Sequence, residues 1–435
     1  MEEKKLGQFN NIHFIGIGGI GVSAIARMMI ALGKNISGSD LNDSNILENL
    51  RRSGAHIVVG HDQKNITDTV DLVVYTIAVT DDNPELVEAK KRGTIILSYP
   101  EALGLLTKEK KTIAVAGTHG KTTTTAMIAD ILISAQKDPT VIVGSLLSQE
   151  RGNYIAGDGE YMVVEACEYR DSFLNLQPFI GVITNIDADH LDYFGNLENI
   201  QKSFKKFAEK IPDNSFLICN PNDTNIKPIL DGLSCNIFDY SKINDETNLS
   251  VPGKHNALNA KAALSVADVL GIKISDAQKI LSGFIGAWRR QEFKGKTKKG
   301  ALVYDDYAHH PTEIKATIQA FKEVFPDKKI SVIFQPHLYS RTKALFDDFV
   351  SALKKADRIV VTDIYAAREP LDESISSEML VQKINENKKE ETKAIYLKTF
   401  DEIIEKVNKW ASVGDVVVTV GAGDIYKAGE CLLEK

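Results

Sequence analysis

The sequence predicts an α/β fold built from three domains, each with a mostly parallel sheet. Short runs rich in Val and Ile alternate with helix-length amphipathic stretches along nearly the whole chain, which is the pattern of βα units. The 435 residues exceed what one compact core usually holds, because domains contain about 100–200 residues. Polar stretches interrupt the alternation at residues 107–111 and 294–300. We therefore expect domains at residues 1–107, 108–297 and 298–435.

Composition and charge exclude several classes of protein. Hydrophobic residues make up 43% of the chain and charged residues 26%, as in ordinary globular proteins. The formal charge of −7 lacks the basic surplus of a nucleic-acid binder, so we expect no nucleic-acid partner. The four cysteines have no C-x-x-C spacing, which argues against a disulfide framework or a zinc cluster. No apolar run approaches the roughly 18 residues that a membrane span needs, and no signal peptide is apparent. We expect a soluble cytoplasmic protein without membrane insertion.

The first glycine-rich phrase, GIGGIG, lies between a strand-like run and a helix-like run. Gly16, Gly18, Gly19 and Gly21 give it the spacing of a dinucleotide-binding loop, and Asp40 follows Gly16 by 24 residues. Glycines before a helix N-terminus accommodate a diphosphate, and the carboxylate could accept a hydrogen bond from a ribose hydroxyl. The residues leave three alternatives open: a nicotinamide cofactor, another diphosphate-bearing ligand, and a purely structural turn.

The second glycine-rich phrase, GTHGKTTT, has the context of a phosphate-binding loop, since it follows TIAVA and precedes AMIADILI. Its glycines allow backbone amides to face a phosphate, while Lys121 supplies charge at the β- and γ-phosphates and Thr122 can ligate Mg²⁺. The standard pattern would place its first glycine at position 115, which is Val115. A capped turn without a ligand would not explain the lysine. The predicted phosphate-contacting residues are Gly117, Thr118, His119, Gly120, Lys121, Thr122 and Thr123.

Two further polar residues follow strands of the same block. Glu165 ends YMVVEA, and His190 follows GVITNI within TNIDADHLDYF. Ligands bind beyond the carboxyl ends of parallel strands, so we predict that Glu165, His190 and Thr122 form a Mg²⁺ site bridging to the γ-phosphate. Glu168 is a lesser candidate for the same role. The alternative for each residue alone is a solvated or internally satisfied side chain.

The third block carries four polar loops at strand ends. Their phrases are DDYAHHPTE, FQPHLYSRT, DIYAAREP and GAGDI. Any one of them could serve only to cap a helix. Because all four are expected at one edge of one sheet, we predict that they contribute to one site.

Taken in order, GIGGIGVSAIA, GTHGKTTT, TNIDADHLDYF, GKHNALNA, DDYAHHPTE, FQPHLYSRT and GAGDI resemble the Mur ligase family. The resemblance covers essentially the whole chain and is strongest to members that add L-alanine to UDP-N-acetylmuramic acid. It implies a Rossmann-like N-terminal domain for the UDP-sugar, a central P-loop-type ATPase domain, and a Rossmann-like C-terminal domain that closes on ATP and the amino acid. It also implies ligation through an acyl phosphate, giving ADP and phosphate, with Mg²⁺ as cofactor (Mn²⁺ substituting). The expected assembly is a monomer or a weak homodimer.

The resemblance implies roles residue by residue. The UDP-sugar would be bound by Gly16, Gly18, Gly19, Gly21 and Asp40. Besides the phosphate loop, ATP would be contacted by His255, Asn256, Asp306 and either Arg289 or Arg290. The catalytic residues would be Lys121, His190, His309 (or His310) and Arg341. The metal ligands would be Thr122, Glu165 and His190. Many alanine-adding relatives carry Arg where this chain has Leu338, and VVEACEYRDSF departs from the EADES form of some relatives.

Three rival functions remain open on sequence grounds. A recycling ligase would join a preformed peptide to the same sugar. A dehydrogenase would use the first glycine loop for a nicotinamide cofactor. A nucleotide-dependent switch would bind nucleotide without forming an amide.

Overall fold

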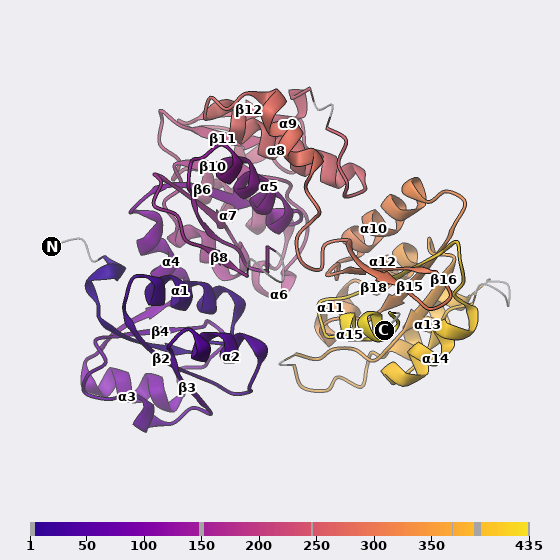
Figure 1. The fold of residues 1–435 in the computed structure, drawn as a ribbon, viewed down its shortest axis with the longest axis horizontal. Coiled ribbons are helices and arrows are strands. Elements are labelled where there is room, and N and C mark those ends of the chain that lie inside the picture. The colour runs from indigo at the N-terminus through magenta and orange to yellow at the C-terminus, as the bar shows by residue number, and fades with distance from the viewer. Residues whose placement is uncertain (1–4, 148–151, 245–246, 368, 387–392, 434–435) are drawn as a thin grey trace. The chain divides into compact units, whose positions relative to one another are not determined.

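The α/β prediction is confirmed by three separate sheets in the computed structural model (Figure 1). The structure describes residues 5–147, 152–244, 247–367, 369–386 and 393–433. The chain divides into two compact units, described separately below: Met1–Thr247 with Leu258–Ser282, and Asn248–Ala257 with Gly283–Lys435.

The first sheet of the first unit has five parallel strands in the order β3-β2-β1-β4-β5. Its strands are β1 (Asn11–Ile15), β2 (Asn35–Asp40), β3 (His56–Val59), β4 (Leu72–Tyr75) and β5 (Ile95–Ser98). Its helices are α1 (Ile20–Ala31), α2 (Asn45–Arg52), α3 (Pro84–Arg92) and α4 (Tyr99–Thr107), with short 3₁₀ turns η1 (Leu6–Gln8) and η2 (Gln63–Asn65). The strand order reverses at β1, which places the first glycine loop at a topological switch point, the usual ligand crevice of such sheets.

The second sheet of this unit has seven strands in the order β12-β11-β10-β6-β9-β7-β8. All neighbours are parallel except β7 and β8, which form an antiparallel pair. Its strands are β6 (Lys111–Ala116), β7 (Thr140–Ile142), β8 (Tyr154–Ile155), β9 (Tyr161–Glu165), β10 (Ile180–Ile183), β11 (Phe216–Cys219) and β12 (Asn236–Asp239). Its helical segments are α5 (Lys121–Ser134), η3 (Tyr169–Asn175), α6 (Leu191–Phe194), α7 (Leu197–Ala208), η4 (Lys227–Ile229), η5 (Tyr240–Lys242), α8 (Lys254–Val269) and α9 (Ile274–Ser282). The residues of α8 before Leu258 belong to the second unit.

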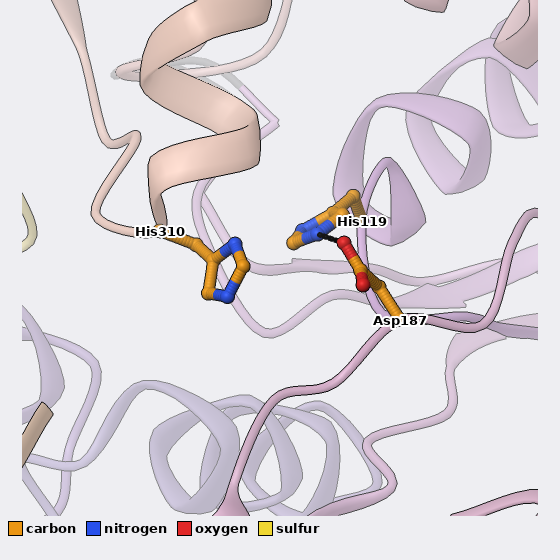
Figure 2. A group of neighbouring side chains, drawn as sticks. All are labelled: His119, Asp187 and His310. Carbon is orange, nitrogen blue, oxygen red and sulfur yellow. Dashed lines mark hydrogen bonds and ion pairs between the residues drawn. The ribbon is translucent and has the colours of Figure 1, made fainter. Parts of the chain in front are cut away.

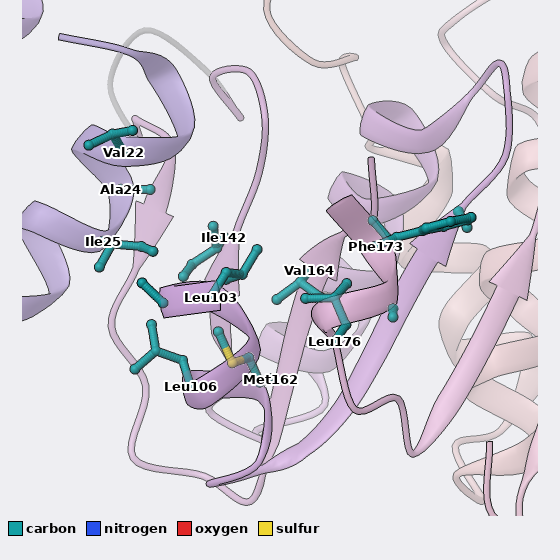
Figure 3. Packing of buried hydrophobic residues seen from close by; sticks show 14 of the residues in the cluster. Val22, Ala24, Ile25, Leu103, Leu106, Ile142, Met162, Val164, Phe173 and Leu176 are labelled. Carbon is teal, nitrogen blue, oxygen red and sulfur yellow. The ribbon is translucent and has the colours of Figure 1, made fainter. Parts of the chain in front are cut away.

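One apolar cluster joins the first two sheets of this unit. Figure 3 shows Ile25 of α1 and Leu103 of α4 gathered with Ile142 of β7 and Val164 of β9. These four side chains are at most 4% exposed. Because close-packed interiors resist relative displacement of their parts, the two sheets share one core rather than two independent ones.

The third sheet lies in the second unit, in the order β13-β14-β18-β15-β16-β17. Only β13 is antiparallel to its neighbour. The strands are β13 (Glu292–Lys296), β14 (Leu302–Asp306), β15 (Lys329–Phe334), β16 (Arg358–Val361), β17 (Ile395–Tyr396) and β18 (Asp415–Val420). The helices are α10 (Pro311–Val324), α11 (Tyr339–Ala344), α12 (Phe346–Leu353), α13 (Ser377–Asn385), α14 (Phe400–Trp410) and α15 (Tyr426–Cys431).

The polar stretch 294–300 is not only a linker, because its first residues belong to β13 and pair with β14. The third sheet therefore begins at Glu292, before the position expected from polarity alone. An edge strand tolerates this composition, since charged residues and bulges are common on sheet edges, and the pairing of β13 with β14 shifts register between Phe293 and Gly295. None of the described helices combines the length and apolar composition that crossing a bilayer requires.

Candidate functional site

The first glycine loop is folded around Asp40. Gly16 has a φ of +73°, and its amide donates to the carbonyl of Ser39 at 2.8 Å. The amide of Gly18 donates to Oδ2 of Asp40 at 2.8 Å. A Cβ on Gly21 would lie 2.5 Å from the ring of Tyr99, so a side chain there would have to displace that ring from α1. The structure thus brings the predicted glycines and Asp40 together.

The second glycine loop begins α5. Gly120 has a φ of +84° and occupies the N-cap, while Lys121 is the first helical residue. The ammonium group of Lys121 donates to the carbonyls of Gly117 at 2.5 Å and Thr118 at 3.0 Å. The lysine therefore folds back over its own loop.

Lys121 forms an ion pair with Glu168. The two groups are 2.9 Å apart, and the side chains are 14% and 3% exposed, respectively. Burial, the largest single effect, lowers the pKa of Lys121, but the nearby negative charges, chiefly Glu168 and also Glu165, together with the hydrogen bond to Glu168, outweigh it, so the pKa lies above its usual value. The loop thus presents a permanent positive charge, which suits a triphosphate.

Glu165 accepts two kinds of hydrogen bond. The hydroxyl of Thr122 donates to its oxygens at 3.0 and 3.1 Å, and the amide of Gly144 donates to Oε2 at 2.9 Å. His190 has a φ of +52° at the N-cap of α6, with its ring 4.8 Å from that of Tyr169. Among the described residues, no hydrogen bond or ion pair joins His190 to Glu165 or Thr122. The predicted metal set is therefore only partly brought into direct contact.

His119 lies beside Asp187, as Figure 2 shows, with Nε2 3.4 Å from Oδ2. The hydroxyl of Thr118 accepts from the Asp187 amide at 2.8 Å. His119 and Thr118 of the phosphate loop thus both contact Asp187.

Sequence reasoning did not single out Asn185, which holds the loop in shape. Its Oδ1 accepts from the amide of His119 at 2.9 Å, and its Nδ2 donates to the carbonyl of His119 at 2.9 Å. The hydroxyl of Thr184 donates to the same carbonyl at 2.6 Å. Both residues lie in TNIDADHLDYF, so a signal existed, but their role depends on β10 lying next to β6.

In the second unit, His255 and Asn256 share a partner that the sequence did not reveal. Gln291 contacts Nε2 of His255 at 3.3 Å and accepts from Nδ2 of Asn256 at 3.2 Å. Asn256 also donates to the carbonyl of Pro252 at 2.7 Å. The structure thus brings this predicted pair together around one glutamine.

Arg289 is enclosed within the second unit. Its guanidinium donates to Asp305 at 2.7 Å and to the carbonyls of Gly421 at 2.6 Å and Gly423 at 2.8 Å. The ring of Tyr426 lies 4.7 Å from it, and the side chain is 2% exposed. These contacts make Arg289 an internal clamp between β14 and the loop that follows β18.

Asp306 is a buried carboxyl group at the end of β14. It accepts from the hydroxyl of Thr317 at 2.7 Å and the amide of Ala308 at 3.0 Å. Burial raises its pKa to about 6, although the positive charge of Arg290 opposes the shift. Arg290 also lies over the ring of Tyr307, 5.1 Å from its centre.

His309, His337 and Arg341 lie close together in the second unit. The rings of His309 and His337 are 6.0 Å apart, and Nη1 of Arg341 is 3.5 Å from Nδ1 of His337. Nδ1 of His309 is 3.1 Å from the carbonyl of Tyr307. His310 instead caps α10, accepting at Nδ1 from the backbone.

Leu338 precedes α11 with a φ of +70°, a conformation that a branched side chain rarely adopts. Its amide donates to the carbonyl of Tyr365 at 3.0 Å. The backbone is thus fixed in a constrained form next to Arg341.

Models of known protein families match the segments that form each of the three sheets. Three family models match: "Mur ligase family, catalytic domain" at residues 11–111, "Mur ligase middle domain" at 115–246, and "Mur ligase, glutamate ligase domain" at 289–423.

Similar proteins extend over the full chain. A UDP-N-acetylmuramate–L-alanine ligase of Clostridium acetobutylicum is 44% identical, covering 98% of this chain and 97% of that protein. One from Caldanaerobacter subterraneus is also 44% identical, covering 100% and 99%. The crystal structure of a UDP-N-acetylmuramate–alanine ligase from Thermotoga maritima has a TM-score of 0.80 at 32% identity, covering 97% and 98%.

A murein peptide ligase from Psychrobacter arcticus shares the fold, with a TM-score of 0.72 at 23% identity over 98% and 100% of the two chains. The full-length matches at 44% identity and the three family models agree with each other. The chain belongs to the Mur ligase family, whose members are ATP-dependent ligases that form amide bonds.

Proposed function

We propose that this protein joins L-alanine to the lactoyl carboxylate of UDP-N-acetylmuramic acid, with conversion of ATP to ADP and phosphate. The observation that carries this proposal is the 44% identity to L-alanine ligases over essentially the full length of both chains. The product is a precursor of peptidoglycan, and the use of ATP as co-substrate favours a cytoplasmic enzyme. We further propose that it acts as a monomer or weak homodimer.

The first chemical step activates the carboxylate. One carboxylate oxygen attacks the γ-phosphorus, the bond between that phosphorus and the bridging oxygen of ADP breaks, and an acyl phosphate forms. Negative charge on the transferring phosphoryl group would be offset by Lys121, whose raised pKa keeps it cationic. The remaining loop residues, Gly117 to Thr123, would supply backbone and hydroxyl donors.

The second step forms the amide. The nitrogen of L-alanine attacks the acyl carbon, the carbon–oxygen bond to phosphate breaks, and phosphate leaves. The attacking amine must lose a proton, which His190 or His309 would accept. The carbonyl of Tyr307 near Nδ1 of His309 supports a proton on that atom, which leaves Nε2 in the accepting form. We assign Arg341 to the acyl-phosphate and amino-acid region.

The residues proposed for Mg²⁺ have suitable chemistry. Thr122 and Glu165 offer the hard oxygen ligands that this ion prefers, and they already face each other. We propose that these two residues and His190 hold it. When bound, the ion would supply positive charge that stabilises the phosphoryl transfer.

The other substrate contacts are proposed from position in the fold. The UDP diphosphate would lie at the N-terminus of α1, where backbone amides of the glycine loop face it. The residues proposed for this contact are Gly16, Gly18, Gly19 and Gly21. His255 and Asn256 would lie at the nucleotide base. Asp306 and Arg290 would act at the nucleotide from the second unit, with Arg289 shaping the loops behind them.

An ADP-release assay tests the proposal. The enzyme is supplied with ATP, Mg²⁺, UDP-N-acetylmuramic acid and each amino acid in turn, and amide product is detected by mass spectrometry. ADP release should require both the sugar nucleotide and an amino acid, and L-alanine should give the highest kcat/KM. Equal ADP release without the sugar nucleotide would contradict ligation.

The rival functions predict other outcomes. A recycling ligase would prefer a preformed tripeptide to L-alanine in the same assay. A nucleotide-dependent switch would bind ATP without amide product, and a dehydrogenase would bind NAD(P)H at the first glycine loop. The 44% identity to alanine-adding ligases favours L-alanine over the tripeptide.

A further inference from the structure

Asn153, directly before β8, touches α1 of the first sheet. Its side chain is 2% exposed. Its Nδ2 donates to the carbonyl of Ile20 and, at 2.8 Å, to the hydroxyl oxygen of Ser23. Ser23 donates in turn to the carbonyl of Ile20 at 2.8 Å, while its amide donates to the carbonyl of Gly19 at 2.8 Å. Asn153 therefore grips the first turn of the helix that begins at the UDP-sugar loop.

The same residue is tied to the proposed metal site by the β7–β8 hairpin. The amide of Val143 donates to the carbonyl of Asn153 at 3.1 Å. The next amide, that of Gly144, donates to Glu165 at 2.9 Å. Glu165 accepts from Thr122 of the phosphate loop. Hydrogen bonds and the peptide link between Val143 and Gly144 therefore connect Gly19, through Asn153, to the residues proposed to hold the ATP metal.

These connections lie against the shared apolar cluster. Ile142 of β7, immediately before Val143, is 1% exposed and packs in the cluster that contains Ile25 of α1 (Figure 3). Dense packing leaves little room for β7 and α1 to shift independently. A displacement of the first turn of α1 would therefore move the β7–β8 pair as well, because the packing between them leaves little free space.

We propose that Asn153 is a positioning residue that couples the two nucleotide sites, so that a UDP-sugar at the first glycine loop and a metal–nucleotide at the second strengthen each other's binding. The inference rests on the proposed function for the identity of the two ligands. Its physical basis is that a diphosphate fixes the first turn of α1, Asn153 fixes the hairpin, and Gly144 fixes the orientation of Glu165.

The side-chain amide of Asn153 makes its contacts with α1 through the donor Nδ2. Its Oδ1 is buried with no hydrogen-bond partner in the described part of the chain, whereas the carbonyl of Ile20 can only accept. Asn153→Asp keeps the shape but replaces the donating group with a repelling oxygen. Asn153→Ala removes the contact altogether.

The test measures the dissociation constant of UDP-N-acetylmuramic acid by calorimetry, with and without Mg²⁺ and a non-hydrolysable ATP analogue. The ratio of the two constants is the coupling factor, which is reciprocal between the ligands and typically about 5–150-fold in coupled proteins. We expect coupling within that range for the wild type and a ratio near one for N153A and N153D. The variants should leave the dissociation constant of the sugar nucleotide measured without the ATP analogue nearly unchanged and raise the constant measured with it.

Two further variants separate coupling from a general loss of stability. Ser23→Ala removes one acceptor of Asn153 with a minimal change of volume, and should reduce the coupling factor even if N153A or N153D folds poorly. Asn236→Ala is the matched control, because the amide of Asn236 also donates to backbone carbonyls, but at β12 on the far edge of the same sheet. It should leave the coupling factor unchanged.

Each outcome decides the matter. Wild-type coupling that is kept in N153A, N153D and S23A overturns the inference, as does a wild-type ratio of one in an enzyme that still ligates. If the wild type neither binds the sugar nucleotide nor forms the amide, the proposed function itself fails, and the inference fails with it. A reduced ratio in these variants, with an unchanged ratio in N236A, supports it.

Discussion

The carboxylate of Asp40 accepts a hydrogen bond from the backbone amide of Gly18 at 2.8 Å. The sequence suggested only that Asp40 could meet a ribose hydroxyl. The structure gives it a second task, because it closes the glycine loop from the end of β2 and so shapes the turn before α1.

Asp40→Ala should therefore raise the KM for the UDP-sugar while leaving kcat nearly unchanged. Loss of a hydrogen bond to a charged group costs about 1.5–3 kcal/mol, which corresponds to roughly a 10- to 150-fold rise in KM. Asp40→Asn keeps an acceptor and should cost less. The matched control is Asp71→Asn, since Asp71 also accepts from backbone amides, at the opposite end of β1. Equal KM values for D40A and wild type would contradict this role.

Lys121→Ala should lower kcat by about 100-fold or more, as expected when a transition-state donor is lost. It should also reduce stability by about 3–5 kcal/mol, because Glu168 is left buried without its partner. The double variant Lys121→Ala/Glu168→Gln should recover stability in urea denaturation but not activity. As a control, Lys111→Ala breaks an exposed pair with Glu160 and should leave stability nearly unchanged, because solvent screens exposed pairs. Near-normal turnover in K121A would refute the phosphate-loop assignment.

Arg289 and Arg290 are adjacent but should respond differently to substitution by lysine. Arg289→Lys keeps the charge but cannot reproduce the fork of bonds to Asp305, Gly421 and Gly423, so we expect a loss of about 1–3 kcal/mol in the free energy of unfolding for each buried acceptor left unsatisfied. Arg290→Lys should leave stability within about 0.5 kcal/mol and raise the KM for ATP. Thermal denaturation and ATP kinetics on both variants provide the measurement. A stable R289K enzyme with an impaired KM for ATP would reverse the two roles.

Asp306→Asn should change how stability depends on pH. Burial raises the pKa of Asp306 to about 6, whereas the pKa of an unfolded aspartate is near 4. Between pH 4 and pH 6 the native state therefore binds more protons than the unfolded state. Stability conferred by this group is therefore greatest below pH 4 and is lost as pH rises to 6. Asparagine removes that loss and can still accept from Thr317.

D306N should consequently be more stable than wild type at pH 7 to 8, by up to about 3 kcal/mol, with the advantage vanishing near pH 4. Urea denaturation at both pH values checks this. A constant difference across the range would contradict a raised pKa. Activity should fall if Asp306 acts at the nucleotide, and the pH dependence of stability is independent of that outcome.

Much of the architecture was readable from the chain. Alternating Val- and Ile-rich runs predicted parallel sheets because buried strands and amphipathic helices have distinct local patterns. The glycine loops were found by spacing alone, since a strand, a tight turn and a helix N-terminus are consecutive in sequence. The start of the third sheet was not found, because Lys294 to Lys296 in β13 are as polar as a linker.

The sequence by itself determined the α/β class, the two glycine loops and the chemical types at the strand ends. Only the tertiary structure decided which partners those side chains meet. Glu168 reaches Lys121, Arg289 turns inward to Asp305, and Asn153 grips the first turn of α1. The physical reason is that these pairings join residues from separate elements, and strand order, which local patterns do not encode, brings those elements together.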